Sequence, residues 1–195
     1  MEKIKRVSSY NKQELYSELY YKVQEIKTRY AHLKTLRQDQ LEWKPGKKPW
    51  SIAQCLDHMN LFMDHYLTRE LVPKMNLAHS SLVDEDLTPG KMGQTCLMAY
   101  HPDYHKKVRA MRYVKPNKAG TPFNVLFKYF DAHLGRIDEL LVHYNNININ
   151  SYTIGGLGNE MLRLKFGSAL LMTVNHNVRH MNQIQRVMDE PGFPS

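Results

Sequence analysis

The 195-residue sequence predicts an all-α fold, a four-helix bundle with a long crossover connection between the second and third helices. Two observations carry this prediction. Four segments repeat apolar residues at intervals of three and four, as the inward faces of amphipathic helices do. No segment shows the strict alternation of apolar and polar residues that is typical of a half-buried strand. The chain length suits one hydrophobic core, so we expect a single domain over residues 1–195.

The first two helices are bounded by clear start and stop signals. The first is expected over residues 12–37, and two prolines and a glycine in the stretch 45–49 prevent its continuation. Ser51 is a good N-cap for the second helix, and Gln54, three residues later, completes a capping box. This second helix is expected to end near Leu71, before Pro73.

The second half of the chain begins with its least regular part, residues 76–120, which prolines and glycines interrupt. A short helix is expected there, around residues 104–112. The third helix is expected to start near Thr121 and Pro122, a cap followed by a proline in the first turn. It ends before the asparagine-rich stretch 145–150. A glycine-rich turn then leads to the fourth helix, expected over residues 159–188.

Two histidines on the fourth helix, His176 and His180, are the first candidate site residues. They are four residues apart, so they are neighbours on one helix face, and they lie in line with the apolar Phe166 and Ile184. A buried imidazole without a hydrogen-bond partner costs about 1–3 kcal/mol. One divalent metal ion would satisfy both rings. Two hydrogen-bonded or half-exposed structural histidines are the alternative interpretation of the same spacing.

A third histidine, His58, lies at the margin of the inward face of the second helix, three residues after Cys55. Three histidines with an open position are the ligand set of a catalytic metal site rather than a closed structural one. A core-edge histidine with an ordinary hydrogen bond is the alternative. Ligating histidines donate their second N–H to a nearby acceptor, and Gln183 is the expected neighbour of His180. Asp57 is expected to face solvent.

The residues around these histidines resemble a known family. Residues 50–54 read WSIAQ and precede His58, and residues 176–184 read H-x-x-R-H-x-x-Q-I. Both motifs are similar to those of the DinB/YfiT-like family of four-helix proteins. The resemblance implies a divalent metal ion, nickel or zinc, held by His58, His176 and His180. We expect Arg179, inside the second motif, to form a salt bridge.

The same resemblance implies two kinds of chemistry. Some relatives are transferases or isomerases that depend on a low-molecular-weight thiol, and others are described as metal-dependent hydrolases. We therefore expect a metal-dependent enzyme that activates a water or a small thiol, with no catalytic side chain beyond the ligands assigned. The alternative is a non-catalytic helical module for ligand binding or dimerisation, with a vestigial metal site.

Composition limits the partners. The net charge is +8, and the densest basic stretch is the basic loop, residues 105–118. This loop is either simply solvated or draws an anionic substrate towards the site. No nucleic-acid-binding module is recognisable, so the expected partner is a small molecule, and a homodimer is left open. The chain has no apolar run of about 18 residues, no secretory signal and no paired cysteine spacing, so we expect no membrane association and a cytoplasmic protein.

Overall fold

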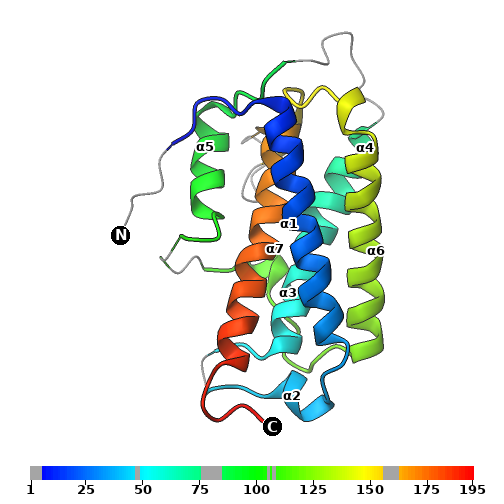
Figure 1. Ribbon diagram of the computed structural model, residues 1–195, viewed down its shortest axis with the longest axis vertical. Helices are drawn as coiled ribbons and strands as arrows, with labels where there is room; N and C mark the ends of the chain where they lie inside the picture. The colour runs from blue at the N-terminus through cyan, green and yellow to red at the C-terminus, as the bar shows by residue number, and fades with distance from the viewer. Residues whose placement is uncertain (1–5, 47–48, 76–84, 105, 107–108, 156–162) are drawn as a thin grey trace.

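The computed structural model of the protein describes residues 6–46, 49–75, 85–104, 106, 109–155 and 163–195. Four long helices pack side by side along the long axis of the molecule (Figure 1). These helices are α1 (Lys12–Leu33), α3 (Ile52–Met63), α6 (Phe123–Val142) and α7 (Phe166–Met188). The predicted all-α fold class is therefore confirmed, with a core formed by the apolar faces of these helices.

Shorter elements connect the long helices. An eight-residue π-helix, η1, continues α3 without a break and leads into one further α-helical turn. A two-stranded antiparallel ladder precedes α7, with Tyr152 opposite Lys165 and Gly155 opposite Arg163. The short elements are α2 (Gln38–Glu42), η1 (Asp64–Leu71), α4 (Val72–Met75), α5 (Gly90–Ala99), η3 (Arg112–Val114), η4 (Tyr144–Asn146), β1 (Tyr152–Gly155) and β2 (Arg163–Lys165).

Several predicted boundaries differ from the structure. The first helix ends at Leu33, four residues earlier than expected. Residues 163–165 form β2 instead of the start of the last helix, and the expected helical residues 159–162 lie outside the described part of the chain. The short helix expected over residues 104–112 is wrong, since the described residues there are irregular up to the 3-10 turn η3. The helix in this connection is α5.

Helix α7 packs against α1, α3 and α5 (Figure 1). Its residues from Phe166 to Val178 are all buried, including polar ones. Burial of this kind is stable only when the polar side chains find partners, because an unpaired buried donor or acceptor costs free energy. The fold thus encloses the histidines of α7 between neighbouring helices.

The connection between α4 and α6 brings a loop to the same place. After α5 packs against α7, the chain crosses to α3, against which η3 packs. The described residues of the basic loop, 106 and 109–118, therefore lie beside the two helices that carry the candidate histidines. None of the described helices combines the length and the apolar character needed to cross a lipid bilayer.

Candidate metal centre

The three predicted histidines meet in space. His58 on α3 and His176 and His180 on α7 are all buried, and each offers one ring nitrogen to a cluster whose atoms lie within 4.8 Å of one another. The Nε2 atoms of His58 and His176 are 3.1 Å apart. Two nitrogens bound at about 2.0–2.1 Å to one ion, with an angle near 100°, would be separated by about 3.1–3.2 Å. The spacing therefore fits a shared metal ion.

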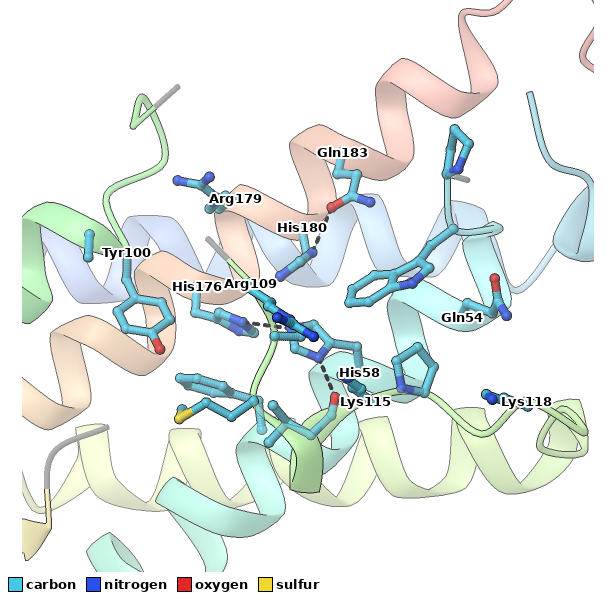
Figure 2. Close-up of a pocket in the computed structure, with 18 residues that line it drawn as sticks. Gln54, His58, Tyr100, Arg109, Lys115, Lys118, His176, Arg179, His180 and Gln183 are labelled. Atoms are coloured by element: carbon cyan, nitrogen blue, oxygen red, sulfur yellow. Dashed lines mark hydrogen bonds between the residues drawn. The ribbon is translucent and has the colours of Figure 1, made fainter. Parts of the chain in front are cut away.

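The remaining nitrogens of two of the rings are held by hydrogen bonds (Figure 2). His58 donates from Nδ1 to the carbonyl oxygen of Val114 in η3, at 2.5 Å, and His180 donates from Nδ1 to Gln183 Oε1, at 3.0 Å. Both acceptors fix the proton on Nδ1, so the Nε2 lone pairs of His58 and His180 are free to bind an ion. Nδ1 of His176 is buried and has no hydrogen-bond partner among the described residues.

Burial keeps these rings neutral. It lowers the pKa of His58, and it lowers the pKa values of His176 and His180 well below the ordinary value, with the neighbouring imidazoles adding to the effect. Neutral imidazoles are the form that binds metal. At neutral pH the cluster therefore presents lone pairs rather than protons to an incoming ion, and three imidazoles suit a transition-metal ion.

The model of the DinB superfamily matches residues 27–184. The chain belongs to the DinB superfamily. The match includes all three histidines of the cluster. No match to a curated protein or to a solved structure was found.

Aromatic rings orient the histidines of this DinB superfamily member. The His176 ring stacks on Phe62, with centroids 3.6 Å apart and an interplanar angle of 11°. The Trp50 ring lies 4.8 Å from that of His58 and 6.2 Å from that of His180. Tight ring packing restricts the rotamers of the imidazoles and so helps to hold their ring nitrogens in a converging arrangement.

The start of α3 sets the position of His58. The Ser51 side chain accepts from the Gln54 N–H at 3.2 Å, and Gln54 Oε1 accepts from the Ser51 N–H at 3.3 Å. This capping box was predicted from the sequence and is confirmed. Since it fixes where the helix begins, it also fixes the face on which His58 lies.

Asp57 was expected to face solvent, and this is wrong. Its side chain is buried, and its carboxylate accepts from the backbone N–H of Asn117 at 2.7 Å and from the hydroxyl of Thr121 at 3.1 Å. The residue next to His58 therefore fastens the segment that supplies the Val114 carbonyl. Both partners are about sixty residues away in the sequence, so no local pattern could reveal them.

Arg179 fastens the other end of the same segment. Its guanidinium donates to the carbonyl oxygens of Lys106, at 2.9 Å, and His101, at 3.4 Å, and lies over the ring of Tyr104. It forms no salt bridge with any described residue, so that expectation is wrong. The motif residue between the two α7 histidines instead ties the basic loop to the helix.

The histidines open into a pocket of about 720 Å³, a size typical of small-molecule sites. Trp50, Phe62 and Tyr100 give it an apolar wall, while Gln54 and Gln183 offer amide groups. None of the described residues that line it is an aspartate or glutamate. The pocket would leave room for a ligand from solution beside an ion held by the three histidines, as a catalytic rather than a structural metal site requires.

Proposed function

We propose that this DinB superfamily protein is a metal-dependent enzyme whose divalent ion, nickel or zinc, is held by His58, His176 and His180. One observation carries the proposal: three buried imidazoles converge at the base of an open pocket of small-molecule size. A bound ion would lower the pKa of a coordinated water to about 7, or hold a coordinated thiol as thiolate. Either product is a nucleophile at neutral pH.

The surrounding residues would set the charge of the ion and hold the histidines in place. Three neutral ligands would leave the charge of a divalent ion uncompensated, because no carboxylate or thiolate of the described residues joins the cluster. Val114 and Gln183 hold the outer nitrogens of two ligands, and Trp50 and Phe62 shield the rings from water. This arrangement supports transferase chemistry with a small thiol, or hydrolysis, as the two forms of the proposal.

Metal analysis tests the proposal directly. The protein is purified without an affinity tag, dialysed against nickel or zinc, and analysed for bound metal beside variants with His58→Ala, His176→Ala or His180→Ala. We expect one ion per chain in the wild type and in the control His32→Ala, an exposed histidine of α1, and a large loss in each ligand variant. Less than a tenth of an equivalent in the wild type would refute the proposal.

Spectroscopy separates the two forms of the proposal. Cobalt-loaded protein is mixed with a small thiol such as cysteine and followed by absorption. A thiolate bound to the metal gives a charge-transfer band, which supports a thiol-dependent transferase. A spectrum that does not change on thiol addition contradicts that form and favours a metal-activated water.

A further inference from the structure

The charges around the pocket have one sign. Arg109, Lys115 and Lys118 of the basic loop and Arg179 of α7 line it, and the lining among the described residues contains no acidic side chain. Figure 2 shows the three loop residues on one segment that runs past the three histidines. A cleft lined by charges of one sign concentrates ligands of the opposite sign.

Among the described residues, no side chain pairs with the charges of the three loop residues. Arg109, Lys115 and Lys118 form no ion pair and no side-chain hydrogen bond with any residue that the structure describes. The basic residues of α1 and its C-cap behave differently, since four of them pair with carboxylates. These are Lys22 with Glu18, Lys27 with Asp138, Arg29 with Glu25, and Lys34 with Asp131.

The carboxylate of Asp57, which contacts this loop, is already occupied by hydrogen bonds. One oxygen of Asp57 accepts from the backbone N–H of Asn117 in the loop and the other from the hydroxyl of Thr121 just after it, and Asp57 does not line the pocket. Arg179 is also used, because its guanidinium holds two carbonyl groups. The loop is thus fastened at two points, and Arg109, Lys115 and Lys118 remain exposed and available to a ligand from solution.

We propose that the substrate of this site is a small organic anion whose carboxylate or phosphate group is bound by Arg109, Lys115 and Lys118. The proposal rests on the proposed function, because it names the class of molecule that reaches the same histidines. Carboxylates and phosphates are the groups that guanidinium and ammonium donors bind best. The apolar part of the molecule packs against Trp50, and its reacting atom lies at the open side of the histidine cluster.

Calorimetric titration tests the proposal. The metal-free protein is used, so that the anion cannot bind directly to a metal ion. The probes are inorganic phosphate, succinate and the neutral diamide of succinate. We expect the two anions to bind and the diamide to bind at least tenfold more weakly, because only the anions meet the loop charges. The combined variant Arg109→Gln, Lys115→Gln, Lys118→Gln is expected to weaken both anions by about tenfold.

A charge-matched control separates this site from the general positive charge of the protein. Lys44, Lys91 and Lys128 are exposed, lie outside the pocket, and are changed together to Gln. The control is expected to bind phosphate and succinate as the wild type does. Equal weakening in the control, unchanged binding in the loop variant, or diamide binding as tight as that of succinate would each overturn the proposal.

Two further measurements complete the test. Zinc affinity of the loop variant is expected to stay within about twofold of wild type, since the ligands and their acceptors are untouched. Wild-type protein that binds phosphate but no zinc would contradict the proposed function, while the loop would still be an anion site. A single-stranded oligonucleotide that binds far more tightly than phosphate, with a steep salt dependence, would overturn the small-anion proposal in favour of nucleic acid.

Discussion

Replacing Asp57 by Asn should weaken metal binding although Asp57 is not a ligand. The carboxylate holds Asn117 and Thr121, and the same segment places the Val114 carbonyl on His58 Nδ1. Asn has nearly the same shape, but it keeps one acceptor oxygen and turns the other into an N–H donor. One of the two loop bonds is therefore lost.

Two effects are expected, a loss of stability and a loss of metal affinity. Loss of a buried hydrogen bond to a charged group costs about 1.5–3 kcal/mol, so we expect the free energy of unfolding to fall by about 2 kcal/mol in Asp57→Asn. Loss of the acceptor behind a ligating histidine typically lowers metal affinity by about 10–100-fold. Because the Val114 carbonyl shifts rather than disappears, we expect the lower end, about tenfold.

Urea denaturation of the metal-free protein measures the first effect, and zinc titration with a competing chelator measures the second. The matched control is Asp138→Asn, whose carboxylate pairs with Lys27 on the surface and is 44% exposed. Surface pairs contribute at most about 1 kcal/mol, and this one is remote from the pocket lining. If Asp57→Asn loses stability but keeps wild-type zinc affinity, the loop does not position His58, and the reasoning is refuted.

Three other substitutions test separate parts of the structure. Gln183→Leu removes the acceptor of the His180 Nδ1–H and should raise the zinc dissociation constant by about 10–100-fold. Gln183→Glu keeps an acceptor oxygen and should retain zinc binding. Wild-type zinc affinity in the Leu variant would contradict the role of Gln183 in orienting His180. Burial lowers the pKa of His133 to about 4. Between about pH 6.5 and pH 4 this histidine is therefore protonated in the unfolded chain but neutral in the folded protein. The free energy of unfolding keeps its full value above this window and falls by up to about 3 kcal/mol as the pH drops through it. His133→Gln should make the urea midpoint fall less steeply over that window, where the buried histidines of the cluster also contribute, and an unchanged pH dependence would refute the assignment. Gly167→Ala would place a Cβ 3.1 Å from two buried side chains, and urea denaturation should show a free energy of unfolding lower by about 1–3 kcal/mol. The control Gly135→Ala, in an open position of α6, should not lower it. Equal effects of the two substitutions would show that packing at position 167 is not the cause.

The features of the fold and site that depend on residues close together in the chain could be predicted from the sequence. Helical periodicity placed the four long helices, and the spacing of His176 and His180 put both rings on one face. The pairing of Gln183 with His180 was predictable for the same reason, because residues three apart on a helix are neighbours, and the structure confirms it.

Features that depend on distant partners could not be predicted. Helix α5 starts at Gly90 and contains Gly93, residues with poor helix propensity. Gly93 faces Ser168 of α7 so closely that a Cβ there would lie 3.0 Å from the Ser168 hydroxyl oxygen. Packing on α7 therefore outweighs local preference. The Val114 carbonyl is a backbone group, which leaves no signal in the sequence, and β2 is too short for its three residues to show alternation.

The distance along the chain between the clustered histidines has a thermodynamic consequence. His58 and His176 are separated by 118 positions, so an ion shared by them would act as a reversible cross-link that closes most of the polypeptide into a loop. Such a ligand of the folded state adds about 4 kcal/mol when its free concentration is about a thousand times its dissociation constant. The melting temperature would then report how much metal is available, and chelation would loosen the junction between α3, α7 and the basic loop together.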